Sequence, residues 1–353
     1  QEAPVLRPLA AAITLTLLPA LGGCMQVCYV AQAAYGQDDF AWRARPIDEV
    51  VADDATPEGR RQLLAMIADV KRYGETQGIA PTNSYRHFVD LPRDNAVYVV
   101  SAAHPLRFES LTWWFPIVGS VPYLGYFNPW EAKLYGERLA EEGWDVDLRG
   151  ASAYSTLGWF DDPILSTMIR PYDGMVGGLV NVVIHESVHA THYVGGQTYF
   201  NESLANYVAD ELTGPYLTER LALDRYQLMA YRMGKLRGDQ RAKRLHETYL
   251  KLEALYASDL SDEEKLKQKA AITAALQVEL GFSRPINNAT LAQARQYHGG
   301  STIFARLHDH CEGDWHRFFA AVKTIEKGAF AEDQQVEIDG ALEPLLTRPC
   351  PAG

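Results

Sequence analysis

The sequence is poor in positive charge for its length. It contains 33 lysine and arginine residues against 45 aspartate and glutamate residues, and its formal net charge is −12. Proteins that bind nucleic acid need a basic surface for the phosphates, and anionic lipid attracts basic clusters. The composition therefore argues against nucleic acid as the main partner and against a polybasic contact with a membrane.

Cysteine is also scarce, with 4 residues in 353, and none of them has the spacing of a metal site. The chain lacks internal repeats and low-complexity tracts as well. With 47% hydrophobic and 22% charged residues, it has the composition of an ordinary folded protein. Its length suffices for one large domain, or for a domain with a subdomain.

One apolar run stands out near the N-terminus. Residues 9–21 are too few to span a bilayer comfortably, but they suit the core of a signal peptide. The run leads into Leu21-Gly22-Gly23-Cys24, which resembles a bacterial lipobox, in which the cysteine is lipidated. We expect residues 1–23 to be a lipoprotein signal peptide, Cys24 to carry the lipid, and residues 24–56 to form an arm. A buried helix of the mature fold is the alternative.

Lipidation of Cys24 would anchor the protein to a membrane of the bacterial cell envelope, facing the periplasm or the exterior. Disulfides form and persist in such compartments. Cys311 and Cys350 could then pair and tie down the C-terminal tail, or they could stay two unpaired thiols. The sequence leaves both readings open.

After the N-terminal segment, the spacing of apolar residues is typical of strands and helices in the first half of the chain and of helices alone in the second half. This predicts an α+β fold with a mixed sheet in its first half. We expect Thr56 to cap a first helix that has Pro57 at its first position and Leu63, Leu64, Ile67 and Val70 on its apolar face. The expected strands lie at 96–101, 110–115, 122–127 and 144–148, with a helix at 130–142. Further helices are expected at 178–194, 201–212, 216–257, 261–279 with Ser261 as its cap, 289–310 and 313–327.

A metal-binding pattern lies in the second half, at His185-Glu186-Ser187-Val188-His189. Residues four apart share one face of a helix, so both imidazoles can reach a single ion. A catalytic zinc takes three protein ligands and keeps one open position. Glu202, on the next expected helix after the Gly195-Gly196 break, can supply the third ligand. The sequence therefore predicts one Zn²⁺ per chain, bound by His185, His189 and Glu202.

The role of Glu186 follows from its position beside the metal, where it can take a proton from water. The alternative is that the histidines are surface or hydrogen-bonded core residues. In an apolar helix, however, these polar groups would be costly to bury unpaired. His192 is expected near the site without being a ligand. Asn206, one turn beyond Glu202, is expected to hydrogen-bond a ligand histidine.

The segment Asn201-Glu202-Ser203-Leu204-Ala205, together with the histidine motif, resembles the gluzincin metallopeptidases, whose third ligand is a glutamate at the start of a downstream helix. A closer resemblance is to the bacterial "putative aminopeptidase" family of predicted lipoproteins, over most of residues 24–213. The segments that carry it are the Cys24 lipobox, Gly36-Gln37, residues 44–50, residues 153–163 and the two motifs of the metal site.

This resemblance implies a zinc peptidase of the cell envelope that acts on peptides or proteins. It implies a gluzincin-like catalytic core with an active-site helix, at residues 57–214, followed by a mostly helical C-terminal subdomain at 215–353. The chain lacks the Gly-x-Met-Glu-Asn segment with which the usual gluzincin aminopeptidases hold the substrate amino group. An endopeptidase of envelope proteins therefore stays an alternative to an aminopeptidase.

Other site residues follow from the expected mechanism, in which Glu186 acts as general base on a metal-activated water. The oxyanion needs a further donor. By analogy with gluzincins we expect Tyr297, with Tyr154, Tyr193 and His298 as alternatives.

Residues 151–163 are expected to form a rim along which a peptide lies, with Tyr154, Asp161 and Asp162 as substrate-binding residues. The two aspartates could anchor a free amine, or they could cap a helix before Pro163. A non-enzymatic lipoprotein with a structural zinc is the last alternative. A structural zinc site, however, needs no general base such as Glu186.

Overall fold

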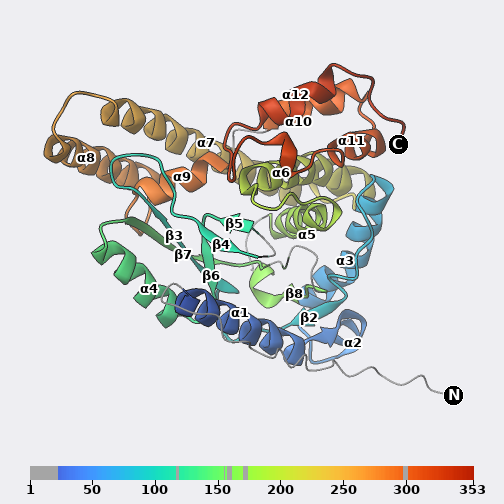
Figure 1. The fold of residues 1–353 in the computed structure, drawn as a ribbon. Coiled ribbons are helices and arrows are strands. Elements are labelled where there is room, and N and C mark those ends of the chain that lie inside the picture. The colour runs from blue at the N-terminus through green and yellow to red at the C-terminus, as the bar shows by residue number, and fades with distance from the viewer. Residues whose placement is uncertain (1–22, 117–118, 155, 157–160, 170–173, 297–300) are drawn as a thin grey trace.

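The fold is α+β, as the sequence predicts. Figure 1 shows it in a computed structural model, which describes residues 23–353 apart from 117–118, 155, 157–160, 170–173 and 297–300. Small sheets lie in the first half of the chain, and helices make up most of the second half. The described helices include none that is both long enough and apolar enough to cross a membrane.

The main sheet is antiparallel and has β3 at its centre, between β6 and β7. Val97, Val99 and Val100 make β3 a typical buried strand, and Val99 pairs with Arg149 on β7. Helix α4 packs against β3 and β7. The bounds are β3 (Val97–Ala103), β6 (Leu124–Tyr126), β7 (Asp145–Ala151) and α4 (Pro129–Glu141).

Two smaller sheets accompany the main one. The expected strand at 110–115 is shorter than predicted and forms a hairpin of β4 (Trp113–Phe115) and β5 (Gly119–Val121). A second sheet has the order β1-β2-β8. Its strands are β1 (Arg45–Pro46), β2 (His87–Val89) and β8 (Ile164–Leu165), followed by a 3-10 turn at Ser166–Met168.

The segment predicted as an arm is mostly helical and packs onto the sheet. Helix α1 (Gly23–Arg43) lies along the edge strand β6. The Gln32 side chain donates to the carbonyl of Gly125 and accepts from the amide of Phe127, at 3.1 and 3.2 Å. These bonds cover backbone groups that an edge strand would otherwise expose. Phe40, near the end of α1, is 1% exposed, so the helix belongs to the core.

The first predicted helix begins one residue later than expected. Pro57 occupies the cap position of α3 (Glu58–Thr76), so Thr56 is not the cap, and no side-chain hydrogen bond caps this helix. The predicted apolar face, with Leu63, Leu64, Ile67 and Val70, is buried as expected. A short helix, α2 (Ile47–Ala52), precedes α3.

Helices α5 (Met175–Thr191) and α6 (Thr198–Pro215) pack against each other, and α5 also packs against α3. The turn between them contains Gly196 at a φ of 78°, a conformation that favours glycine. The carbonyl of Gly196 accepts a hydrogen bond from the amide of Gln334 at 2.7 Å. The turn is therefore fixed by a C-terminal segment far away in the sequence.

The C-terminal half differs from the prediction at several helices. The expected helix at 313–327 is shorter, at Trp315–Val322, and the helix at Asp339–Leu346 is not among the expected ones. The expected helix at 216–257 is split into a π-helical turn, Tyr216–Arg220, and α7, which Asp224 caps by accepting from two backbone amides. The expected helix at 289–310 contains α9 and α10, and residues 297–300 between them lie outside the described residues. Ser261 caps α8 as predicted. The bounds are α7 (Arg225–Tyr256), α8 (Asp262–Leu280), α9 (Asn288–Gln296), α10 (Ser301–His310), α11 (Trp315–Val322), a 3-10 turn at Lys327–Ala329 and α12 (Asp339–Leu346).

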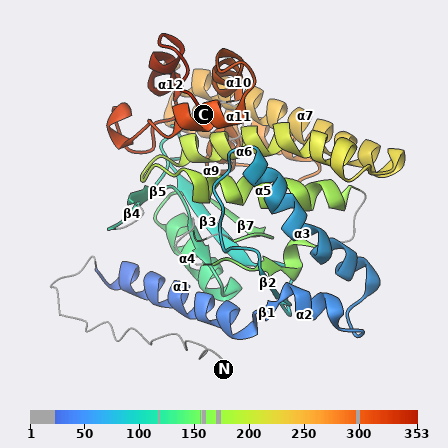
Figure 2. The ribbon, with the colours of Figure 1, turned by 90° about the vertical axis from the view of Figure 1, so that its right-hand side faces the viewer.

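The last three helices lie over α6, and both views place them at the opposite end of the molecule from α1 (Figures 1 and 2). Phe304 and Phe318 pack in the same hydrophobic cluster as Phe200 of α6. Residues before and after position 215 thus share one core. Cys311 and Cys350 form a disulfide, so the pairing alternative holds, and the C-terminal tail is tied to α10.

Candidate metal centre

Helices α5 and α6 bring the three predicted ligands together. The Nε2 atoms of His185 and His189 are 3.2 Å apart. The two carboxylate oxygens of Glu202 lie 3.5 Å from the His185 nitrogen and 3.6 Å from the His189 nitrogen. In the described part of the chain, this is the one group of three or more His, Cys, Asp or Glu residues that could hold a metal ion.

These distances fit a zinc ion. Bonds from zinc to histidine nitrogen and carboxylate oxygen are about 2.0–2.2 Å long, so two ligands of a tetrahedral zinc lie about 3.3–3.6 Å apart. The three separations observed, from 3.2 to 3.6 Å, are close to that tetrahedral edge. The side chains are therefore already arranged for one ion, with the fourth position of the tetrahedron left to water or substrate.

The triad is electrostatically coupled and well buried, with His189 only 3% exposed. Burial works against the charge of Glu202, but its hydrogen bond to His185 and both imidazole charges lower its pKa to about 2. Burial also opposes the charge of His185, yet the bond to Glu202 and the nearby carboxylates raise its pKa to about 9. Burial lowers the pKa of His189 to about 4. A divalent cation bound by these groups would displace protons from the histidines.

Asn201 holds the turn between the ligand helices. Its Oδ1 accepts from the amide of Val194 and its Nδ2 donates to the carbonyl of the same residue, each at 2.9 Å. The side chain is 1% exposed. Asn206 hydrogen-bonds His185, as predicted, and so orients one ligand ring.

Glu186 lies on the same helix as the histidines and is half-buried. Its charge contributes to the raised pKa of His185. Burial, followed by the charges of Glu186 and Asp162, also raises the pKa of Tyr85. Tyr85 has a φ of 66°, an uncommon conformation for a tyrosine. The general base predicted from the motif therefore lies beside the triad and close to a buried phenol.

The comparisons with known proteins agree with this centre. The family described as "Putative aminopeptidase" matches residues 28–336, a range that contains all three ligands and Glu186. The chain belongs to this family. No curated protein and no solved structure matches it. This member of the Putative aminopeptidase family therefore carries its metal-binding motif well inside the matched range.

Among the candidate oxyanion donors, Tyr193 lies next to the triad. Its ring meets that of His189 edge-on, with the centroids 6.4 Å apart. Burial and the charge of Glu202 raise its pKa to about 12, so the phenol keeps its proton. Tyr154 instead packs against Phe40 and Phe127, with ring centroids 5.9 and 5.1 Å away. Tyr297 and His298 lie outside the described residues.

The two aspartates of the expected rim differ in their surroundings. Asp161 is exposed, whereas Asp162 is 3% exposed. The carboxylate of Asp162 accepts from the amide and the hydroxyl of Thr156, both at 2.8 Å. No helix begins at Pro163, because strand β8 follows there, so the helix-cap reading is wrong. Substrate binding by Tyr154, Asp161 and Asp162 stays a prediction.

Sequence reasoning did not identify the roles of Asn201 and Arg149. Asn201 stands inside the glutamate motif, but only the folded turn shows that Val194 is its partner. Arg149 is on β7, and its charge lowers the pKa of Glu202, after the larger effects of burial and the histidines. Nothing in the local sequence around Arg149 indicates this effect, because the distance between Arg149 and Glu202 depends on the tertiary packing of β7 and α6, each of which contacts α9.

Proposed function

We propose that this chain is a zinc-dependent peptidase of the gluzincin type. The observation that carries the proposal is the triad of His185, His189 and Glu202 at tetrahedral spacing, with Glu186 on the same helix. Two imidazoles and one carboxylate are a ligand set typical of catalytic zinc in peptidases. The Putative aminopeptidase description of the family supports peptides as the substrate.

The ion, when bound, would polarise the scissile carbonyl and acidify a water molecule. Glu186 takes the proton of the attacking water and delivers it to the leaving amine. Its half-buried position on α5 favours this task, because partial desolvation makes a carboxylate a better base. Tyr193, protonated and beside His189, donates a hydrogen bond to the oxyanion.

We infer that the enzyme is an aminopeptidase, on the description of its family. The discriminating measurement compares peptides with a free N-terminus against the same peptides N-acetylated. An aminopeptidase cleaves only the free form, and equal cleavage of both would make the enzyme an endopeptidase.

We also propose that the protein is lipid-anchored through Cys24 in the bacterial cell envelope. The lipobox-like sequence before Cys24 supports this, and so does the Cys311–Cys350 disulfide, which belongs in an oxidising compartment. Mass spectrometry of the mature N-terminus tests it. A chain that starts before Cys24, or that carries no lipid, would contradict it.

The test of the proposed function is digestion of a peptide library by purified protein, together with metal analysis of the same sample. We expect about one zinc per chain and cleavage that stops when a chelator removes the ion. Folded protein that contains no zinc after purification with added zinc would refute the site.

A further inference from the structure

A polar cavity of about 450 Å³ lies next to the metal centre. Residues of β7, α6, α7 and α9 form its wall. The lining residues include Arg149, Asn206, Arg241 and Gln293. Asn206 links the two sites, because it hydrogen-bonds the ligand His185 and also lines the cavity.

Two buried donors in this wall have no partner among the described residues. They are Nδ2 of Asn206 and Nε2 of Gln293. Gln293 is 8% exposed, so its amide is more than nine-tenths buried. A buried donor without an acceptor destabilises the protein, because the donor has lost its hydrogen bond to water. A ligand that brings acceptor oxygens would relieve this cost at both amides.

The charged residues that line the cavity leave it positive, because two of its arginines form no salt bridge with a described residue. Lys235 is paired with Asp210 at 2.6 Å. Among the described residues, by contrast, neither Arg149 nor Arg241 forms a salt bridge. In the described part of the chain, Arg149 donates from Nε to Oε1 of Gln293 at 2.9 Å and from no other atom, which leaves its terminal nitrogens for a ligand.

The carboxylate of Asp147 also lines the cavity, but it does not make the cavity negative. Oδ2 of Asp147 is buried and lacks a partner among the described residues. Its other oxygen, however, accepts from Thr290 at 3.1 Å and is ion-paired with Arg284. The charge of Asp147 is thus already compensated, and the cavity favours an anion over an amine.

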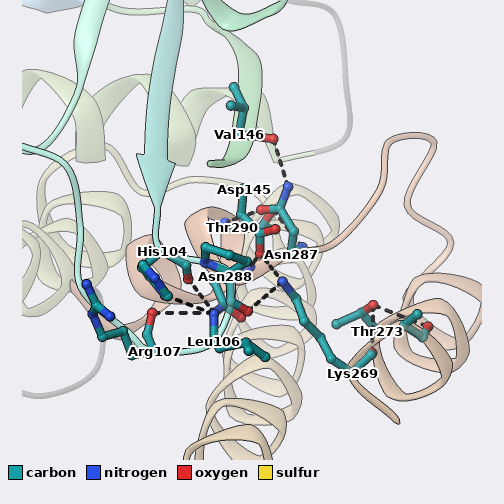
Figure 3. Close-up of polar contacts among 12 residues, drawn as sticks. His104, Leu106, Arg107, Asp145, Val146, Lys269, Thr273, Asn287, Asn288 and Thr290 are labelled. Atoms are coloured by element: carbon teal, nitrogen blue, oxygen red, sulfur yellow. Dashed lines mark hydrogen bonds and ion pairs between the residues drawn. The ribbon is translucent and has the colours of Figure 1, made fainter. Parts of the chain in front are cut away.

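Helix α9, which carries the donor Gln293, is held in place by hydrogen bonds at its first residue, Asn288. Figure 3 shows Asn288 bonded through its amide nitrogen to Asp145 and through its side chain to the carbonyl of His104, both at 2.8 Å. Lys269 of α8 binds the same Asp145 carboxylate. Gln293 follows Asn288 on the same helix, and its Oε1 accepts from Arg149, so both its backbone and its side-chain amide are held. Such a pre-organised donor adds affinity at low entropic cost.

We propose that this cavity binds a carboxylate of the peptide substrate, held by Arg149, Asn206 and Gln293. Asn206 is one turn beyond Glu202 on α6, a rise of about 6 Å. An extended peptide advances about 3.3–3.6 Å per residue, so the carboxylate belongs to the first or second residue from the scissile bond. The group is either the C-terminal carboxylate of a short peptide or an acidic side chain. This inference rests on the proposed peptidase function and names its substrate class.

The experiment measures kcat and KM of the zinc-loaded enzyme for two pairs of tripeptides. One pair differs only in a free or amidated C-terminus, and the other has Glu or Gln next to the scissile bond in an amidated peptide. We expect the wild type to prefer the carboxylate member of one pair by about tenfold in kcat/KM. The pair that shows the preference identifies the source of the carboxylate.

Arg149→Gln should abolish that preference by raising KM for the carboxylate peptide, while KM for the neutral peptide changes little. Arg149→Lys should restore part of it, because the charge returns without the fork of donors. The matched control is Arg138→Gln on α4, whose side chain is 68% exposed and paired only with Glu142. The control should keep the wild-type preference.

Binding gives a readout that does not depend on turnover. Calorimetry with zinc-loaded Glu186→Gln protein should show about tenfold tighter binding of the carboxylate peptide than of its neutral partner. Equal binding of both members of each pair would overturn the proposal, whether or not the arginine variants fold. A wild type that cleaves none of the peptides would instead refute the peptidase function, and this binding comparison would still decide what the cavity holds.

Discussion

Asn201 binds both backbone groups of Val194, with its Oδ1 on the amide and its Nδ2 on the carbonyl. The two residues flank the turn that separates the histidine helix from the glutamate helix. Because both polar atoms of the Asn201 side chain bond this one residue and the side chain is buried, we expect the angle between the ligand helices to depend on it.

Asn201→Ala should therefore lower the free energy of unfolding of the metal-free protein by about 2–4 kcal/mol, because two buried backbone groups lose their partners. Zinc affinity should fall as well, since the histidines and Glu202 no longer hold their spacing. Chemical denaturation measures the first effect and competition with a chelator the second. Asn83→Ala, at an exposed position, is the control and should change neither.

Glu186→Gln should keep the zinc and lose hydrolysis. Glutamine has nearly the shape of glutamate, but it cannot take a proton from water. We expect kcat to fall by at least about 100-fold, the lower end of what a general base contributes, at unchanged zinc content. Metal analysis and peptide cleavage on the same preparation check this. A variant that cleaves at the wild-type rate would remove Glu186 from the mechanism.

Glu202→Gln should instead lose the metal. The substitution removes the negative charge that faces both imidazoles at 3.5 and 3.6 Å. Bound zinc raises the free energy of unfolding of the wild type by about 2.7 kcal/mol at a free concentration of 100 Kd, and the melting temperature rises with it. A thermal melt with and without zinc should show this rise in the wild type and in the control Glu211→Gln, an exposed residue of the same helix. A zinc-dependent rise of normal size in Glu202→Gln would contradict the ligand assignment.

Asp69 should contribute to stability in a pH-dependent way. Hydrogen bonds from Arg220, together with those from Arg72 and Tyr216, outweigh burial and lower the pKa of Asp69 to about 2. Since the folded pKa lies below the unfolded one, the stabilisation is complete above about pH 5 and is lost as the pH falls toward 2.

Asp69→Asn should thus destabilise the protein at neutral pH by about 1 kcal/mol, a value that allows for solvent screening of a partly exposed pair. The difference from wild type should shrink as denaturation is repeated at falling pH. Asp54→Asn, whose carboxylate is fully exposed, should show no such trend. If the free energies of unfolding of Asp69→Asn and wild type differed by the same amount at every pH, the charge of Asp69 would not be the cause of the difference.

The Cys311–Cys350 disulfide should stabilise the C-terminal helices. It closes a loop with a sequence separation of 39, for which the loss of chain entropy in the unfolded state corresponds to at most about 4 kcal/mol. The double variant Cys311→Ser, Cys350→Ser should melt at a lower temperature than the wild type. Reductant should lower the melting temperature of the wild type and leave that of the variant unchanged. Equal melting of both proteins without reductant would show that the bond adds no stability.

The sequence predicts the ligand set well because the chemistry is local. His185 and His189 share a helix face through simple periodicity, and Glu202 comes after a turn with two glycines between the two helices. The apolar faces of α3 and α5 are predictable for the same reason. Their buried residues recur at helical spacing.

The features that the sequence did not predict depend on tertiary contacts. Arg149 meets Gln293 across a sequence separation of 144, a pairing that no local pattern indicates. The break before α7 is different, since Asp224 is a good cap that is recognisable ahead of its helix. The local pattern of the N-terminal segment indicates only an arm, because the docking of Gln32 on β6 depends on the finished sheet.

The metal centre has one more consequence, for the order in which the protein folds. All three ligands come from residues 185–202, and the bond pair of Asn201 closes the loop between them. Contacts between residues so near in sequence cost little loop-closure entropy, and local contacts form fast. We expect this helical hairpin to be a nucleus that binds zinc before the C-terminal helices have packed over α6, so that ion capture comes early in folding.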